Sequence, residues 1–369
     1  MQPTSDLATS PEKPRAANPQ PLEFRQDLRL AQSFELDSAQ TREAVQGLLR
    51  VNPRIYWIDL FFSAAIGWGA FAVALLLRPF SLTMLAAVGL AALALYRALC
   101  FVHEISHQSS RTLPGFETAW NWLAGYGLLM PSFVYVGVHP NHHKISTYGT
   151  VQDPEYLPFA RSSRMTTVFA LEGFFIPAAL LLRFLVLTPI GLIVPRFQKW
   201  LVVYASALTM NVKYRREATE QLIKKVRLHS AVIFFLWAAL IAAATRGMVP
   251  WRFFAIWFVV CGLASAVNTF RTLGAHAYES SGEPLDREGQ LLDSIDTPGA
   301  FWTELWAPVG LRYHALHHYF PGIPYHSLPE AYHRLTTAQP VAASYRKMTS
   351  PSLPHSLITL LKKGSRNLP

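Results

Sequence analysis

The residues of this chain that most clearly suggest chemistry are its clustered histidines. The sequence contains 13 histidines, and most of them fall in one His-x-x-x-His string, two His-x-x-His-His strings and a single position between them. These clustered histidines are His103, His107, His139, His142, His143, His276, His314, His317 and His318. Imidazole is the commonest metal ligand in proteins, so strings of this kind predict a metal site.

The spacing within the strings indicates how the histidines could be shared between ions. Residues four positions apart lie on one face of a helix, so His103 and His107 could bind the same ion. In a His-x-x-His-His string the first two histidines share a face, and the third is rotated by about 100° from the second. One string could therefore serve two neighbouring ions. Because one ion takes about four to six ligands, the histidines predict a two-metal centre, although imidazole suits Fe, Cu, Zn and Ni alike.

Each string has a simpler explanation when it is taken by itself. His103, Glu104 and His107 fit the His-Glu-x-x-His signature of zinc proteases, in which the glutamate is the general base. A single His-x-x-His-His string could be a structural zinc site. A zinc protease needs only one further ligand, so it would leave most of the clustered histidines unexplained. The histidines outside the clusters are expected to be structural or solvated, and they are His229, His326, His333 and His355.

Long apolar blocks are the elements that must position these histidines. Hydrophobic residues make up 51% of the chain and charged residues only 15%, which excludes a disordered protein, and 2 cysteines exclude a disulfide scaffold. Four uncharged runs approach the roughly 20 residues that a helix needs to cross a bilayer. They are paired by short turns, which predicts an all-α integral membrane protein with two helical hairpins. The predicted transmembrane helices span about 55–77, 80–101, 230–246 and 251–273.

Two further apolar stretches, 118–138 and 165–195, are predicted to lie on the membrane surface. The first is rich in Trp and Tyr, which suit the headgroup region, and the second is interrupted by Glu172, Pro177 and Arg183. If either stretch alone crossed the bilayer, the histidine strings would be divided between its two sides. A shared metal site therefore favours four spans, and a protein with six spans is the alternative.

Charge and polarity give the expected domains and orientation. Residues 1–53 are polar and are predicted to form a tail and an interfacial helix, without the apolar core of a signal peptide. Residues 54–335 are expected to form the membrane domain, with interfacial helices and a cytosolic helical cap that holds the metal site. Residues 336–369 are expected to form a C-terminal cytoplasmic tail. The net charge is +10, and the positive-inside rule predicts cytoplasmic termini and a cytoplasmic metal site, in a bacterial inner membrane.

The histidine strings resemble those of one known superfamily. Together with the segment from Asn268 to His276 and the sequence Phe320-Pro-Gly-Ile-Pro, they resemble the membrane-bound fatty acid desaturases over roughly residues 55–335. The resemblance implies two irons held by the clustered histidines, O₂ as co-substrate, and a fatty acyl substrate carried as free acid, acyl lipid or thioester. The implied reaction is the introduction of a C=C double bond. Hydroxylation and the decarboxylation of a fatty acid to a 1-alkene are the alternatives on the same scaffold.

Departures from the patterns of the superfamily's subclasses argue against an acyl-CoA substrate, a front-end desaturase and a fused cytochrome domain. His103 and His107 are more closely spaced than in stearoyl-CoA-type enzymes, and His314 stands where front-end desaturases carry Gln. The chain has no His-Pro-Gly-Gly haem motif, and its cysteines are too few for an iron–sulfur cluster. Electrons are therefore expected from a separate ferredoxin or cytochrome with its reductase. The basic segment 196–227 could bind such an acidic partner or anionic membrane lipid.

Residues near the strings are candidates to orient the ligands. A metal-bound histidine usually donates its other N–H to a carboxylate or carbonyl, and Asp153 is the strongest candidate for that role, followed by Glu104. Glu155, Asp293 and Asp296 are also close in sequence. Asn268 could hold a water near a metal or join two helices.

One other class of function fits the sequence less well. A non-catalytic metal-binding or transport protein would place polar ligands inside the spans, where this chain has no histidine. No nucleic-acid partner is expected.

Overall fold

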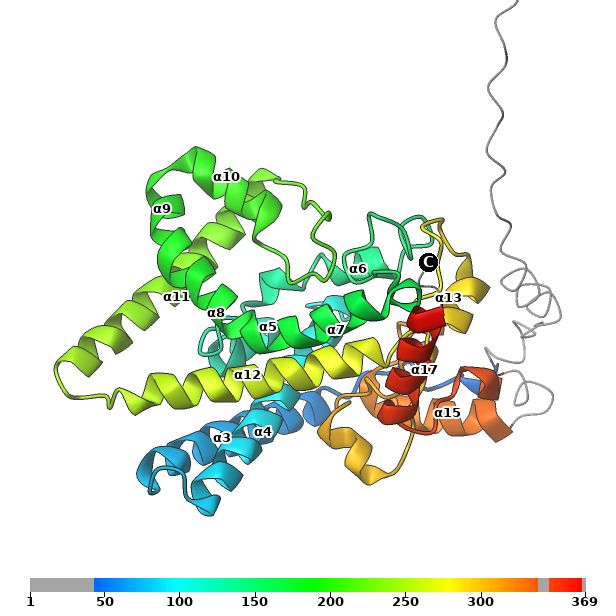
Figure 1. The fold of residues 1–369 in the computed structure, drawn as a ribbon, viewed down its shortest axis with the longest axis horizontal. Coiled ribbons are helices and arrows are strands. Elements are labelled where there is room, and N and C mark those ends of the chain that lie inside the picture. The colour runs from blue at the N-terminus through cyan, green and yellow to red at the C-terminus, as the bar shows by residue number, and fades with distance from the viewer. Residues whose placement is uncertain (1–42, 338–344, 367–369) are drawn as a thin grey trace, which may run out of the picture. The chain divides into compact units, whose positions relative to one another are not determined.

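The computed structural model describes residues 43–337 and 345–366, and Figure 1 shows that this part of the chain is built from helices. Four helices are much longer than the others, and they form two hairpins. They are α3 (Pro53–Leu76), α4 (Leu82–His107), α11 (Glu220–Thr245) and α12 (Arg252–Leu273). Side chains of Asn52, Ser81 and Thr219 cap the first turns of α3, α4 and α11, which fixes where these helices begin. The described residues contain isolated β-bridges but no strand.

The two hairpins pack against each other through α4 and α12. Within the first hairpin, Gly67 permits close approach, because a Cβ at this position would lie 2.6 Å from Leu95 Cγ. Buried tryptophans link the hairpins to the neighbouring segments, because each packs its apolar ring in the core and donates its indole N–H to a backbone carbonyl. Trp257 donates a hydrogen bond to the Gly127 carbonyl at 2.8 Å, and Trp120 donates one to Ala98 at 2.7 Å.

A fifth helical stretch is also long and apolar enough to cross a membrane, so five candidates are present where we expected four. This stretch, Ser163–Ile193, contains α7 (Ser163–Glu172), α8 (Ile176–Leu181) and α9 (Thr188–Ile193). A 3-10 turn precedes the second of these helices and a π-helical turn precedes the third. These changes of helix type accommodate Pro177 and Pro189, so the prolines do not break the stretch into separate pieces. Whether it crosses the membrane or lies on its surface stays a prediction.

The other stretch that we expected on the membrane surface, 118–138, forms only short pieces. These include α5 (Phe116–Trp120), a π-helical turn over Asn121–Gly125 and a 3-10 turn over Ser132–Val134. After α9, the helix α10 (Pro195–Tyr204) turns the chain back toward α11.

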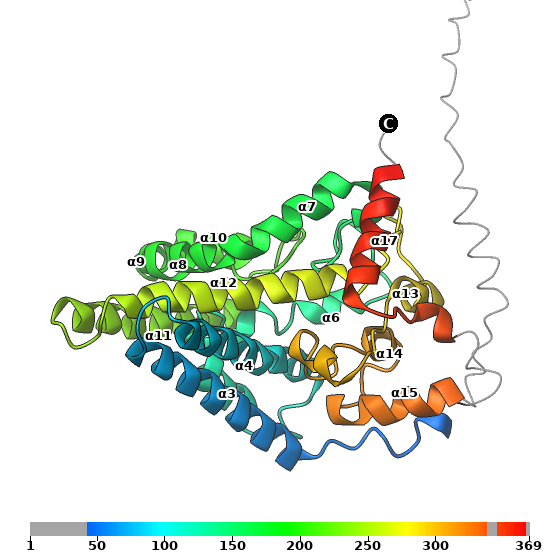
Figure 2. The ribbon, with the colours of Figure 1, turned by 60° about the horizontal axis from the view of Figure 1, so that its bottom comes forward.

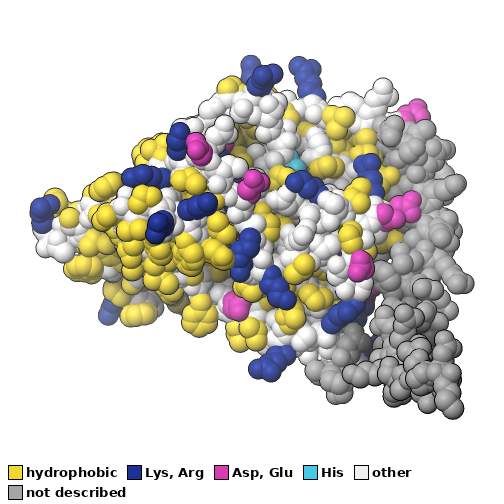
Figure 3. Space-filling view, turned by 90° about the horizontal axis from the view of Figure 1, so that it is seen from above, with side chains coloured by type: hydrophobic (Ala, Val, Ile, Leu, Met, Phe, Trp, Pro, Cys, Tyr) yellow, Lys and Arg dark blue, Asp and Glu magenta, His cyan; other side chains and the backbone are white. Residues whose placement is uncertain are grey.

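The long helices expose apolar side chains outward. Figure 3 shows hydrophobic side chains gathered over the half of the view where Figure 1 places α8, α9 and α11. Large exposed side chains on these elements include Leu182, Ile190, Leu228 and Phe235. Exposed apolar area of this extent suits contact with lipid.

The short helices form a cap at the end of the hairpins opposite their turns (Figure 2). They include α6 (His139–His142), α13 (Arg287–Asp293), α14 (His314–Tyr319), α15 (Leu328–Thr337) and α17 (Leu353–Arg366). The predicted tail at 1–53 falls mostly outside the described residues. The predicted tail at 336–369 includes α17, which packs against α7 because its apolar side chains, such as Leu360, recur on one face.

Candidate metal centre

The cap collects the clustered histidines from four separate segments. The last turns of α4 supply His103 and His107, and α6 with the residue that follows it supplies the second string. His276 lies three residues beyond the end of α12, and α14 supplies the third string. The histidines fall into two groups, in each of which the candidate ligand atoms lie within 4.8 Å of one another. The five-histidine group is His103, His107, His139, His143 and His317, and the four-histidine group is His142, His276, His314 and His318.

Each His-x-x-His-His string contributes to both groups, as the spacing predicted, but the division within the string differs from the expected one. His139 and His143 are together, and His142 belongs to the other group. The third string is divided in the same way. The reason is that residues four apart on a helix differ in direction by about 40°, whereas residues three apart differ by about 60°. The first and third histidines of the string therefore share a face more closely than the first and second.

The facing nitrogens have the spacing of ligands around one ion. In the four-histidine group, His276 Nε2 is 2.8 Å from His314 Nε2 and 3.3 Å from His142 Nε2. In the five-histidine group, His143 Nε2 is 2.9 Å from His139 Nε2. Two nitrogens that bind one ion at about 2.1 Å and at right angles lie about 3.0 Å apart.

Hydrogen bonds at Nδ1 leave the Nε2 atoms of two of these histidines available to a metal. His142 Nδ1 donates to Asp153 Oδ2 at 2.9 Å. Tyr148 donates its hydroxyl proton to Asp293 at 2.9 Å, so its oxygen accepts from His276 Nδ1, also at 2.9 Å. When both imidazoles are neutral, both Nε2 atoms therefore carry lone pairs, which a metal ion between them would accept. The donor set thus fits divalent transition-metal ions.

Carboxylates hold one histidine of each group. Asp153 is fully buried and also accepts from the backbone N–H groups of Gly149 and Glu155, at 3.0 and 2.9 Å. Glu155 accepts from His139 Nδ1 at 2.8 Å. Hydrogen bonds of this kind fix the tautomer and the orientation of a ligand.

The other two candidates for orienting ligands lie differently. Glu104 accepts from the Tyr56 hydroxyl and from the Tyr325 backbone N–H, and its Oε1 is 3.6 Å from His103 Nδ1, beyond hydrogen-bond distance. Asn268 accepts from Arg271 Nη2 at 3.1 Å in a neighbouring cavity.

The electrostatics of the centre favour neutral imidazoles. Burial, together with repulsion from neighbouring histidines, holds the pKa values of His276, His314 and His317 well below the usual range. Burial also lowers the pKa of His142, but the carboxylates of Asp153, Glu155 and Asp293 together outweigh this and the net shift is upward. Burial raises the pKa of Glu155 to about 7. Neutral imidazole is the form that binds a metal, so most of the site is prepared for binding without losing protons.

Sequence reasoning missed the contacts that position α14. Asp296 Oδ1 accepts from the backbone N–H groups of Ala315 and Leu316, at 2.7 and 3.2 Å, and so caps the first turn of the helix. Tyr345 donates to the other oxygen of Asp296 at 2.5 Å. Tyr148 was missed as well. Nothing in the local sequence around these tyrosines indicates which distant carboxylate they reach.

The histidines expected to be structural lie outside both groups. His229 pairs with the Tyr126 hydroxyl at 3.0 Å, and His326 accepts from the Asn52 backbone N–H at 3.1 Å. Part of the basic segment 196–227 also has a structural role, because Arg216 donates to the carbonyls of Phe133 and Val136.

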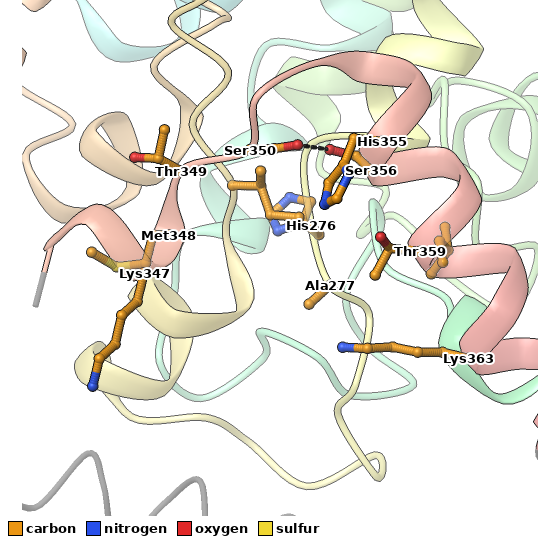
Figure 4. A pocket seen from close by; sticks show the side chains of 12 residues that line it. His276, Ala277, Lys347, Met348, Thr349, Ser350, His355, Ser356, Thr359 and Lys363 are labelled. Atoms are coloured by element: carbon orange, nitrogen blue, oxygen red, sulfur yellow. Dashed lines mark hydrogen bonds between the residues drawn. The ribbon is translucent and has the colours of Figure 1, made fainter.

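Two cavities border the centre. One, of about 190 Å³, lies between the loop after α12, the 347–350 segment and α17, and Figure 4 shows His276 at its inner side, with His355, Lys347 and Lys363 around it. Ser356 donates to Ser350 across it at 2.7 Å. The other, of about 150 Å³, is lined by His103, by polar groups and by apolar side chains of α4, α8 and α12.

Two comparisons with known proteins found similar sequences. The family model described as "Fatty acid desaturase" matches residues 79–349. A protein of Caulobacter vibrioides (strain NA1000 / CB15N) described as "Ceramide hydroxylase" is 38% identical to this chain over 333 residues, which are 89% of this chain and 94% of that protein.

Proposed function

The chain belongs to the fatty acid desaturase family, and we propose that within this family it is an O₂-dependent hydroxylase of an acyl chain in a ceramide-type lipid. The observation that carries this proposal is the 38% identity to a ceramide hydroxylase, which extends over nearly the whole of both chains. The apolar helices and the cavity beside His103 suit a membrane lipid as substrate.

The residues of the centre have distinct tasks in this proposal. The nine clustered histidines would hold two irons, which when bound would activate O₂ for reaction with an unactivated C–H bond. Asp153 and Glu155 keep His142 and His139 in the tautomer that leaves Nε2 free for the metal. The buried cap excludes bulk water from the reacting carbon.

Desaturation is the second candidate, and it is the reaction that we expected first from the histidine strings. The description of the family model favours it. Decarboxylation to a 1-alkene is a further outcome on the same scaffold, but it requires a free carboxylate on the substrate. Family membership does not separate these reactions, because function depends on the site and its groove rather than on the fold.

Product analysis separates the three reactions. Membranes that contain the full chain would be supplied with a deuterated ceramide, a deuterated free fatty acid, and a ferredoxin or cytochrome with its reductase. We expect mass spectrometry to find a ceramide with one added oxygen and one lost deuterium. Loss of two hydrogens without gain of oxygen would overturn hydroxylation in favour of desaturation, and a product one carbon shorter would indicate decarboxylation. Membranes with the His142→Ala variant are the control.

We also propose that both termini and the metal centre face the cytoplasm of a bacterial inner membrane. This topology is supported by the two hairpins, because the centre forms at the ends of α4 and α12 that lie opposite the hairpin turns (Figure 2). Reporter enzymes fused to the C-terminus and inserted at the turn before α12 should report opposite sides of the membrane. Reports from the same side would contradict the topology.

A further inference from the structure

Arg271 is a charged side chain that lines the cavity beside His103. It lies in the last turn of α12, where Asn268 and Thr272 are its neighbours on the helix. These three side chains belong to the polar residues of the cavity lining, which also include Tyr135 and Glu155. The apolar residues of the lining include Leu99, Met130, Phe169, Ile176 and Leu208.

The hydrogen-bonding capacity of Arg271 is only partly used. Its Nη2 donates to Asn268 Oδ1 at 3.1 Å and to Thr272 Oγ1 at 3.0 Å, and both acceptors are neutral. Its Nε is buried and has no hydrogen-bond partner. Within the part of the chain that the structure describes, no carboxylate lies within ion-pair distance of this guanidinium. By contrast, Arg97 pairs with both Asp59 and Glu304.

A partly buried charge without an anionic partner is unfavourable unless something compensates it. The helix dipole favours a cation in the last turn of α12, but it does not supply a hydrogen-bond acceptor for Nη1, to which no described residue is bonded. An acceptor oxygen entering the cavity would supply one. The guanidinium offers donors in a fixed plane, which suits a carbonyl, hydroxyl or carboxylate oxygen.

The size of the cavity limits what can accompany that oxygen. Its volume is about 150 Å³. A protein cavity of about that volume holds a molecule the size of benzene, or roughly six heavy atoms. A polar head group and the first few carbons beside it would fill the space between Arg271 and His103, whereas a long stretch of chain would not fit.

We propose, on the basis of the proposed function, that Arg271, supported by Asn268 and Thr272, binds an acceptor oxygen of the substrate's polar head group. The oxidised carbon is then one of the first few carbons next to that head group, and the remaining chain lies outside this cavity. The acceptor oxygen belongs to the amide or hydroxyl groups of a ceramide, or to the carboxylate of a free fatty acid, which offer the same chemistry to the guanidinium.

Equilibrium binding tests this role without turnover. The purified full-length protein in detergent would be titrated under nitrogen with a radiolabelled ceramide, the matching free fatty acid, and an alkane of the same chain length. We expect Arg271→Gln to weaken binding of a head-group-bearing lipid by about tenfold to a hundredfold, as for a lost hydrogen bond to a charged group. Alkane binding should not change, and Arg271→Lys should restore part of the affinity. If Arg271→Gln loses affinity only for the ceramide, the bound oxygen belongs to the amide or a hydroxyl group. If it loses affinity only for the free fatty acid, the bound oxygen belongs to the carboxylate.

Arg252→Gln is the matched control, because it makes the same change at the opposite end of the same helix. It should bind all three probes as the wild type does. In turnover assays, the residual product of Arg271→Gln should carry the modification at more scattered positions. Unchanged binding of both lipids by Arg271→Gln, or equal loss for the alkane, would overturn the proposal. A wild-type protein that binds ceramide but oxidises neither lipid would instead refute the proposed function.

Discussion

Asp153→Asn should remove one of the two metals and leave the other. Asp153 contacts His142, a member of the four-histidine group, and contacts no member of the five-histidine group among the described residues. An asparagine side chain in the same place can present its NH₂ group to His142 Nδ1. That arrangement favours the tautomer whose proton is on Nε2, where the metal must bind.

The magnitude follows from the hydrogen bond that is lost. A hydrogen bond to a charged group contributes about 1.5–3 kcal/mol, and each 1.4 kcal/mol is tenfold in affinity. We therefore expect the affinity of the four-histidine group for iron to fall by about tenfold to a hundredfold, the range found when partners of metal ligands are mutated. One backbone N–H, of Gly149 or Glu155, also loses its acceptor, which should lower the stability of the fold by about 1–3 kcal/mol.

The assay is iron content per folded chain, measured by elemental analysis during a titration with a chelator, on protein that elutes as a single species. The wild type should hold about two irons, and Asp153→Asn should lose one of them at a lower chelator concentration. Glu155→Gln is the paired control, because Glu155 contacts His139 in the other group, and it should weaken the other iron. Simultaneous loss of both irons in both variants, or loss of neither, would refute the assignment of each carboxylate to one group.

Three further outcomes follow from the structure. Alanine at His142, His276 or His317 should abolish turnover, whereas His355→Ala, which lies outside both groups, should retain it. Equal loss of turnover in all four variants would indicate a folding defect rather than the loss of a metal ligand. Tyr345→Phe should lower the stability of the protein by about 1–3 kcal/mol in thermal unfolding, because it leaves a buried oxygen of Asp296 without its donor, and an unchanged melting temperature would contradict this role. Gly364→Ala should make α17 easier to cleave in limited proteolysis, because a Cβ there would lie 2.5 Å from the Ser163 backbone nitrogen and would disturb the packing of the helix. Gly69→Ala, which has open space around its Cβ position, should not change the cleavage of α17.

The parts of the fold that sequence predicted well depend on local pattern. The four predicted spans correspond to α3, α4, α11 and α12, because long uncharged runs and capping residues such as Asn52 and Ser81 act within a few residues of each other. The clustered histidines could be identified as candidate metal ligands because their spacing is also a local pattern. Their spacing was informative even though the division of each string between the two groups was not foreseen correctly.

The parts that sequence could not predict depend on contacts between distant segments. Tyr148 forms a hydrogen bond with His276, 128 positions away, and Tyr345 forms one with Asp296, 49 positions away. No local sequence pattern predicts such long-range contacts. The continuity of Ser163–Ile193 was missed for a different reason. A proline usually ends a helix, and the 3-10 and π-helical turns through which this stretch continues pack against α12 and α11, which are distant in sequence.

The division of α14 between both groups of histidines has a consequence for biosynthesis. Each group takes histidines from α6 and from α14, and α14 follows every other segment that contributes a histidine to the two groups. While the chain is being synthesised, both groups of histidines stay incomplete until this short helix is made. Neither group has its full set of histidines until α14 has been synthesised, which is after all four long helices. A chain that stops before His314 can therefore complete neither group.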